Sequence, residues 1–183
     1  METNQVILVN EKDEMLGVMD KTTAHQQGKL HRAFSVFIFD NSGRMLLQQR
    51  ALDKYHSAGL WSNACCSHPR PGEELTQAVK RRLQEELGFE TAIEGLFSFI
   101  YKATVGNGLT EFEFDHVFVG EYSGAVLHNT LEVSQTRFEK MDMISEELQN
   151  NPQHYTEWFR LAFPRMESWY KQRYTVIAGE QGK

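Results

Sequence analysis

The residues best suited to hold a metal ion are three histidines and two glutamates, His25, His31, His68, Glu111 and Glu113. The spacing of His25 and His31 is too long for one helical face and fits a loop or an extended segment that folds back. Glu111 and Glu113 lie in the alternating run E-F-E-F, so on a strand they would point the same way, about 7 Å apart. Three imidazoles and two carboxylates would form an N3O2 set that suits octahedral Mn²⁺, Fe²⁺ or Zn²⁺.

Each of these residues also has an ordinary interpretation. A single histidine can be a surface residue or a hydrogen-bonded core residue. Glu111 and Glu113 could form the solvated face of an edge strand. The sequence alone does not establish that the five side chains converge.

The segment R-R-L-Q-E-E-L-G-F at 81–89 resembles the end of the Nudix box, G-x5-E-x7-R-E-U-x-E-E-x-G-U, in which U is aliphatic. Counting back from its first arginine aligns Glu73 with the box glutamate and Ser67 with the box glycine. The glutamates of that motif bind metals that help to cleave a diphosphate, but Arg82 replaces the first glutamate of R-E-U-x-E-E. Because a guanidinium can grip phosphate but cannot hold a metal, this change favours binding a diphosphate without cutting it. Apart from the resemblance, Arg82 and Glu86 would be an ordinary i,i+4 ion pair.

Six short motifs follow one another in order along the chain: A-H-Q-Q-G-K-L-H, R-A-L-D-K, C-S-H-P, Y-K-A-T, E-F-E-F and Y-T-E-W-F. With the altered box, they resemble type 1 isopentenyl-diphosphate isomerases, a Nudix-fold family, over roughly Val6 to Phe163. Ser67 departs from the glycine that often follows the cysteine of this family, a difference of one hydroxymethyl group.

The resemblance assigns a role to each matching position. It makes the three histidines and two glutamates the ligands of one divalent metal, and Cys66 the catalytic cysteine. Glu113 would share the proton transfers with Cys66, Tyr101 would hydrogen-bond Glu113, and the indole of Trp158 would face the reacting carbons. Cys65 would be only a small buried residue.

The same resemblance implies a site for the diphosphate. Glu86 would hold a second ion, Mg²⁺, that arrives with the substrate. The expected cationic contacts are Lys21, Arg50, Lys54 and Arg82. By default each of these would be a solvated surface charge, and Trp158 could simply be the buried residue of an amphipathic helix.

The expected reaction interconverts isopentenyl and dimethylallyl diphosphate by protonation and deprotonation. Protonating an unactivated alkene creates a tertiary carbocation, so the site must exclude water and hold an acid and a base against the allylic unit. Two other functions stay open: a Nudix hydrolase of a nucleoside or other diphosphate, and a non-catalytic metal-binding module on a Nudix scaffold.

The composition is that of a globular protein with an acidic balance. The 183 residues are 40% hydrophobic and 24% charged, with a formal net charge of −6, which argues against a nucleic-acid partner. No stretch approaches the ~20 apolar residues of a membrane span, and the N-terminal residues lack the features of a signal peptide. The adjacent Cys65 and Cys66 would make a strained disulfide, so we expect free thiols and a cytoplasmic protein. No heptad pattern is visible, and a monomer is favoured.

The pattern of elements predicts an α+β fold, a Nudix-like α/β/α sandwich in which helices flank a mixed sheet, with additional N- and C-terminal elements. We expect one domain over residues 1–183, with its core at about 30–165 and a frayed tail at 177–183. Apolar spacing followed by Gly88 predicts a helix over 74–87. The remaining predictions are strands at 6–9, 33–39, 44–49, 96–104 and 111–119, with hairpin turns at 40–43 and 106–108 and helices beyond Ser145, where Pro152 and Pro164 suggest breaks or starts.

Overall fold

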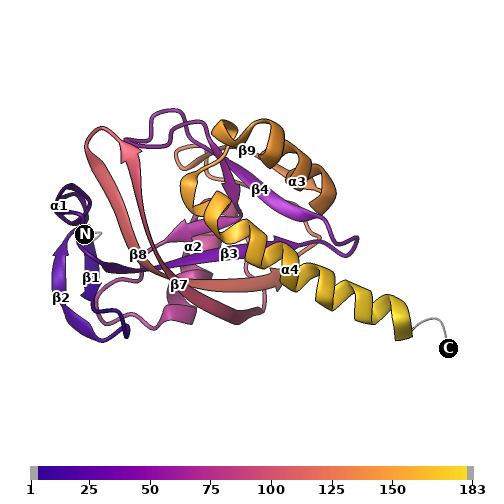
Figure 1. The fold of residues 1–183 in the computed structure, drawn as a ribbon, viewed down its shortest axis with the longest axis horizontal. Helices are drawn as coiled ribbons and strands as arrows, with labels where there is room; N and C mark the ends of the chain where they lie inside the picture. The colour runs from indigo at the N-terminus through magenta and orange to yellow at the C-terminus, as the bar shows by residue number, and fades with distance from the viewer. Residues whose placement is uncertain (1–3, 181–183) are drawn as a thin grey trace.

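The computed structural model describes residues 4–180, with side chains to residue 174 (Figure 1). One sheet runs through this part of the chain, and helices cover both of its faces. The strands are β1 Gln5–Val9, β2 Met15–Asp20, β3 His31–Phe39, β4 Met45–Arg50, β5 Trp61–Asn63, β6 Cys65–Ser67, β7 Ile93–Gly106, β8 Leu109–Glu121 and β9 Val133–Glu139. The helices are α1 Lys21–Gln27, α2 Leu75–Leu87, α3 Met141–Asn150, the 3-10 turn η1 Pro152–His154 and α4 Glu157–Glu180.

Strand β3 is the central strand of this region of the sheet. It runs parallel to β8, with His31 opposite Glu113 and Ser35 opposite Val117. On its other side it pairs antiparallel with β6, which sets Ser35 opposite Cys66. Strand β7 completes this region by pairing antiparallel with β8. The order β6-β3-β8-β7 therefore brings three distant segments of the chain side by side, the third being the β7–β8 hairpin.

The two faces of the sheet pack against different helices, which confirms the predicted α/β/α sandwich (Figure 1). Alternate residues of β3 point to opposite faces, so Val36 packs with α2 whereas Phe37 packs with α4. The same alternation in β6 sends Cys65 into the α2 side and Cys66 towards the α4 side, and both cysteines are free. The prediction that Cys65 is a small buried residue is confirmed, since it is 0% exposed.

Helix α2 matches its prediction to within one residue. Ala78, Val79, Leu83 and Leu87 are buried, as the apolar spacing requires. Gly88 follows in the left-handed region with φ 73°, and a Cβ there would lie 2.6 Å from the carbonyl oxygen of Leu127. Glycine is therefore needed at this end of the helix both for its backbone angles and for the close approach.

Two predictions about the first half of the chain need correction. His25 does not lie in a loop or extended segment but on α1, which Asp20 caps by accepting a 2.9 Å hydrogen bond from the backbone N–H of Thr23. Gly28 ends this helix in the left-handed region. The segments 33–39 and 44–49 do form strands, but the register of β3 and β4 contains only the pair Phe39–Met45, because β4 pairs mainly with β5 and β9.

The second half follows the expected pattern with shifted boundaries. The hairpin of β7 and β8 turns at Asn107, which has a φ of 53°. Pro152 begins the 3-10 turn as expected, whereas Pro164 lies inside α4, where one lost backbone hydrogen bond does not end the helix. Helix α4 continues to Glu180, so residues 177–180 of the predicted tail lie at the end of a helix. Residues 181–183 lie outside the described part of the chain.

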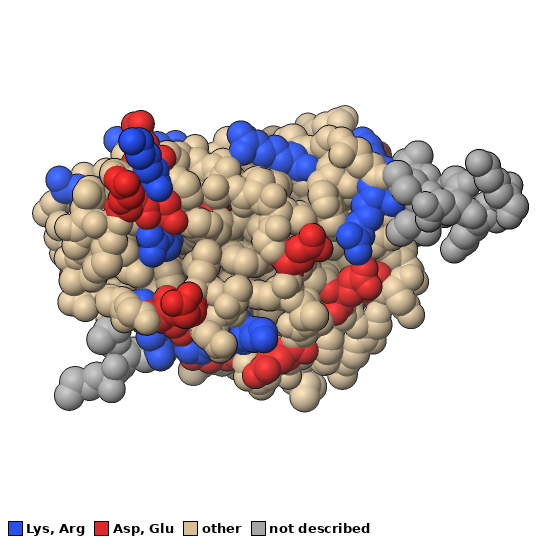
Figure 2. Space-filling model, turned by 90° about the horizontal axis from the view of Figure 1, so that it is seen from below, with Lys and Arg blue, Asp and Glu red and all other residues tan. Residues whose placement is uncertain are grey.

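Among the described residues, no helix is both long and apolar enough to cross a bilayer. On the face shown in Figure 2, basic and acidic side chains are interspersed, and neither sign forms a continuous field.

Candidate active site and metal centre

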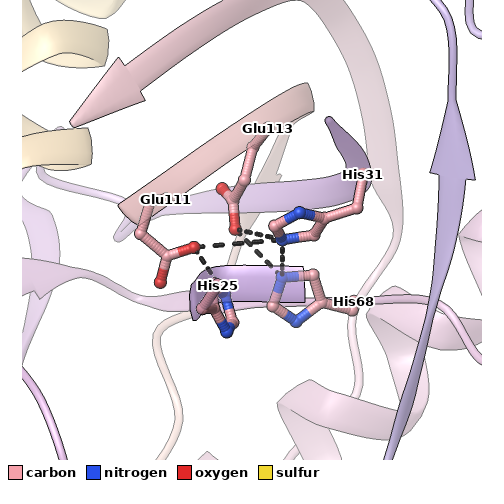
Figure 3. A group of neighbouring side chains, drawn as sticks. All are labelled: His25, His31, His68, Glu111 and Glu113. Atoms are coloured by element: carbon pink, nitrogen blue, oxygen red, sulfur yellow. Dashed lines mark hydrogen bonds and ion pairs between the residues drawn. The ribbon is translucent and has the colours of Figure 1, made fainter. Parts of the chain in front are cut away.

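The five predicted metal ligands converge at one place (Figure 3). One ligand atom from each residue lies within 4.8 Å of the corresponding atom of every other. Helix α1 supplies His25, the start of β3 supplies His31, and the loop after β6 supplies His68. Strand β8 supplies Glu111 and Glu113, which are 4% and 8% exposed. Because both carboxylates are buried, the alternative of a solvated edge-strand face is wrong.

Burial, hydrogen bonds and neighbouring charges set the states of several groups in this cluster. Burial of His31 opposes its protonation, but its contacts with Glu113 outweigh this effect and raise the pKa of the ring. His31 donates from Nδ1 to the carbonyl oxygen of Lys29 at 2.8 Å, so the lone pair of its Nε2 faces the cluster. Burial lowers the pKa of His68 to about 4, which keeps its ring neutral. Burial opposes ionisation of Glu111, but the adjacent His25 and the hydrogen bond from His56 outweigh it and hold the pKa of that carboxyl well below its usual range.

Two buried atoms of the cluster indicate whether its residues could bind a metal ion. Nε2 of His25 and Oε2 of Glu111 are 2.7 Å apart, yet neither has a hydrogen-bond partner of acceptable geometry among the described residues. Nε2 of His31 also lies 3.2 Å from Nε2 of His68. Such convergence of ligand atoms, two of them without a hydrogen-bond partner, is what a shared cation would satisfy, so the residues fit a divalent metal.

A small pocket of about 50 Å³ adjoins the cluster. It is lined by Lys21, Arg50, His56, Cys66, Ser67, His68, Tyr101, Glu111, Glu113 and Trp158. The predicted proton-handling pair and the predicted tyrosine and tryptophan therefore share one cavity. Its walls combine one thiol, two carboxylates and two aromatic rings.

The thiol of Cys66 is held in its protonated form. Burial raises the pKa of the Cys66 thiol to about 12, and the negative charge of Asp115 adds to the rise. The thiol donates to Oδ1 of Asn63 at 3.0 Å, and Ser35 Oγ lies 3.5 Å away. The amide of Asn63 is oriented by its own donation to the carbonyl oxygens of Val36 and Cys65.

Two aromatic residues bound the same cavity. Tyr101 donates a 2.6 Å hydrogen bond to Oε2 of Glu113 and is 6% exposed. Trp158 is 5% exposed, and its Nε1 donates to Oγ of Ser62 at 2.9 Å. The guanidinium of Arg50 lies over the Trp158 ring, 5.3 Å from its centroid. The indole is thus fixed at its polar end with one face towards cationic groups.

All of the predicted diphosphate contacts line a second pocket of about 70 Å³, contiguous with the first through Arg50, Cys66 and Trp158. Lys21 also lines both pockets, and the other walls of the second include Lys54, Arg82, Glu86, Gln48 and Glu132. Arg82 donates to Oε1 of Glu86 at 2.5 Å, and Gln48 donates to the other oxygen at 2.9 Å. None of these cations is a freely solvated surface charge.

Comparison with known proteins agrees with this arrangement. Residues 29–159 match the NUDIX domain. The isopentenyl-diphosphate Delta-isomerase of Serratia proteamaculans is 47% identical over 169 residues, which cover 90% of this chain and 94% of that protein. The protein of the same description from Pectobacterium atrosepticum is 44% identical over 171 residues, covering 93% and 96%. This chain belongs to the isopentenyl-diphosphate Delta-isomerase family. The family consists of isomerases, as the resemblance implied.

Solved structures confirm the Nudix fold of this isomerase-family chain. DR0079 from Deinococcus radiodurans has a TM-score of 0.68 at 20% identity, over 80% of this chain and 90% of that one. The MutT protein of Methanosarcina mazei has a TM-score of 0.64 at 20% identity, over 78% and 96%. At this level of identity the likeness concerns the fold alone.

Two polar residues of this family member were missed by the sequence analysis. His56 donates to Glu111, with 3.1 Å between its Nε2 and Oε1, and is 6% exposed. Glu132 accepts from Lys54 at 2.5 Å and lies 3.5 Å from Arg82. Neither belongs to a motif that points to chemistry. The adjacency of His56 to R-A-L-D-K was the only available signal.

Proposed function

We propose that this chain interconverts isopentenyl and dimethylallyl diphosphate by a protonation–deprotonation 1,3-allylic shift, as a step of isoprenoid biosynthesis. The observation that carries the proposal is that a thiol, Cys66, and a carboxylate, Glu113, line one small pocket contiguous with a cationic one. A five-carbon diphosphate needs such a pair of subsites, one for the alkene and one for the diphosphate.

Cys66 and Glu113 act as the general acid and the general base. One of these groups gives a proton to the terminal alkene carbon while the other removes a proton from the allylic carbon, and the roles exchange in the reverse reaction. The half-buried thiol, whose pKa is raised, supplies a proton at neutral pH. Tyr101 holds Glu113 in place and assists its proton transfer. Trp158 offers a π face to the tertiary cation, worth about 2 kcal/mol when water is excluded.

The diphosphate is bound without hydrolysis. Lys21, Arg50, Lys54 and Arg82 provide its cationic contacts, and Glu86 would hold a Mg²⁺ ion that enters with it. Arg82 lies against Glu86, at the position where a hydrolytic Nudix enzyme has a metal-binding carboxylate. This contact supports isomerisation over the alternative of a Nudix hydrolase. A half-buried thiol beside the metal cluster argues in the same way against a non-catalytic binding module.

The resident metal of the cluster would be Mn²⁺, Zn²⁺ or Fe²⁺, held by His25, His31, His68, Glu111 and Glu113. When bound, it would supply positive charge that tunes the acidity of Glu113. We further propose a monomer that acts on a small diphosphate and not on nucleic acid or membrane. Its two free cysteines support the proposal that the protein is located in the reducing cytoplasm.

An isomerase assay tests the proposal. Purified protein is incubated with Mg²⁺ and isopentenyl diphosphate in D₂O, and products are followed by NMR together with released phosphate. We expect dimethylallyl diphosphate that carries deuterium, with phosphate at background. Phosphate release as the main outcome would establish the hydrolase instead, and the absence of both products would support the binding module.

A further inference from the structure

His56 lies in the loop between β4 and β5, at the junction of the metal cluster and the cationic pocket. Its ring is 6% exposed and packs edge-on against Trp158, with 6.0 Å between the ring centroids and an interplanar angle of 88°. The ring of Tyr55 packs against it in the same manner, at 4.5 Å. A buried imidazole needs partners for both ring nitrogens, and the environment of His56 provides them.

The side chain of His56 forms a directed chain of hydrogen bonds that ends on a metal-ligand residue. Its Nε2 lies 3.1 Å from Oε1 of Glu111, a carboxylate that can only accept, so Nε2 carries the proton. Its Nδ1 is then an acceptor, and Oγ of Ser57 lies 3.3 Å from it. The other oxygen of Glu111, Oε2, faces His25 at 2.7 Å. One oxygen of Glu111 is thus occupied by His56 while the other points into the cluster.

The main chain of His56 contacts the cationic pocket. Its carbonyl oxygen accepts a hydrogen bond from Nη2 of Arg50 at 3.3 Å. The loop is anchored to the β7–β8 turn, because Asn107 donates to the carbonyl oxygen of Tyr55 at 2.9 Å. His56 therefore contacts the metal cluster through its ring and a diphosphate-binding arginine through its backbone.

We propose that His56 is a positioning residue that holds Glu111 through Oε1, so that Glu111 binds the metal through Oε2 alone. This inference rests on the metal centre of the proposed function. Without the imidazole, Oε1 would be a buried charged oxygen lacking a donor, and the carboxylate would be free to rotate. Partners of this kind typically change metal affinity 10–100-fold when removed.

Two substitutions of His56 distinguish the effect of its hydrogen-bond donor from the effect of its ring packing. His56→Gln places a side-chain N–H near the position of Nε2 but removes the ring. His56→Phe keeps a ring against Trp158 but removes the donor. Exposed His154, which pairs with Glu147 and lines neither pocket, provides the control His154→Ala. Each protein is stripped with a chelator and titrated with Mn²⁺ by calorimetry, after circular dichroism has confirmed its fold.

We expect His56→Phe to bind Mn²⁺ about 10–100-fold more weakly than the parent chain, and His56→Gln and His154→Ala to bind within about threefold of it. In the isomerase assay His56→Phe should lower kcat with little change in KM, because the carbonyl group that holds Arg50 is retained. Parent-like affinity of His56→Phe, or equal losses in both His56 variants, would overturn the proposal.

A second measurement needs no variant. In the Zn²⁺-loaded protein, ¹⁵N NMR of the His56 ring should show the neutral Nε2–H tautomer with a slowly exchanging proton. A Nδ1–H tautomer would overturn the inference even if His56→Phe fails to fold. Both readouts concern metal binding and not turnover. A chain that binds Mn²⁺ as expected but does not isomerise would therefore refute the proposed function and leave the role of His56 intact.

Discussion

The hydroxyl of Tyr101 donates to Oε2 of Glu113 at 2.6 Å, while Oε1 of the same carboxylate lies 2.9 Å from Nε2 of His68. The two oxygens of Glu113 thus face different partners. Tyr101 and Glu113 are direct neighbours across β7 and β8, so the sheet register itself sets this contact. Glu113 can accordingly bind a metal through one oxygen and exchange a proton through the other.

Replacing Tyr101 by phenylalanine tests whether the two oxygens of Glu113 have different roles. A hydrogen bond to a charged group contributes about 1.5–3 kcal/mol, so Tyr101→Phe should lower kcat roughly 10–100-fold. Metal content should stay at the parent level, because Oε1 is untouched. Tyr170→Phe is the control, since it removes a tyrosine hydrogen bond to the carbonyl oxygen of Gly43, far from the site. Loss of metal in Tyr101→Phe would contradict the division of roles.

The adjacent cysteines allow a matched pair of substitutions. Cys66→Ala should reduce kcat at least 1,000-fold without loss of the resident metal, because it removes one of the two proton-transferring groups. Cys65→Ala acts on the opposite face of the sheet, where it should lower the free energy of unfolding by about 1 kcal/mol and leave kcat within threefold. Steady-state kinetics and chemical denaturation measure the two effects. Retained turnover in Cys66→Ala would remove this thiol from the mechanism.

Arg82 is expected to affect both substrate binding and stability. Arg82→Ala should raise KM roughly 10–100-fold through the loss of a charge-assisted contact with the diphosphate. It should also lower the free energy of unfolding by about 2 kcal/mol, because buried Glu86 loses its cationic partner. Arg160→Ala breaks an exposed ion pair with Glu157 and should change neither quantity measurably. An unchanged KM in Arg82→Ala would place the diphosphate elsewhere.

Removal of the metal should destabilise the fold. A ligand at 1,000 times its dissociation constant stabilises the folded state by about 4 kcal/mol. For a chain of this size this corresponds to a fall in Tm of roughly 10 °C after chelation. Elemental analysis of the protein as purified identifies the resident ion. Mn²⁺ or Zn²⁺ should restore both Tm and activity, whereas Ca²⁺ should not, because it prefers oxygen ligands to imidazoles. An unchanged Tm after complete removal would contradict the N3O2 centre.

The ion pair of Glu73 and Arg81 predicts a pH-dependent contribution to stability. The hydrogen bonds from Arg81 hold the pKa of Glu73 below its ordinary value of 4.5. A depressed folded-state pKa stabilises the fold above pH 4.5, and this contribution is lost as the pH falls through the folded pKa. Glu73→Gln should therefore be less stable than the parent at pH 7, with the difference shrinking below pH 4.5. Denaturation of both proteins across this range measures it, with exposed Glu90→Gln as the charge control.

Local periodicity accounts for what could be predicted from the chain alone. The alternation of E-F-E-F places Glu111 and Glu113 on one face, and the apolar spacing before Gly88 defines α2, because each pattern depends on residues two to four positions apart. The short helix α1 was missed although Asp20 and Gly28 are suitable caps, because seven residues are too few for a periodic signal.

The sequence motifs predicted which residues belong to the site, but they did not predict how those residues are arranged. The resemblance assigned His25, His31, His68 and Cys66 to one site, and the structure brings all of them together. It did not indicate His56 or Glu132. Glu111 lies 55 positions from His56, and Arg82 lies 50 positions from Glu132.

The sequence by itself determined the residue types of the site, the two-residue spacing of its carboxylates and the fold family. Only the tertiary structure decided that His31 lies opposite Glu113, because the parallel pairing of β3 with β8 joins segments about 80 positions apart. Such pairings depend on burial of both faces of the sheet against α2 and α4, and no local pattern encodes a contact across that distance.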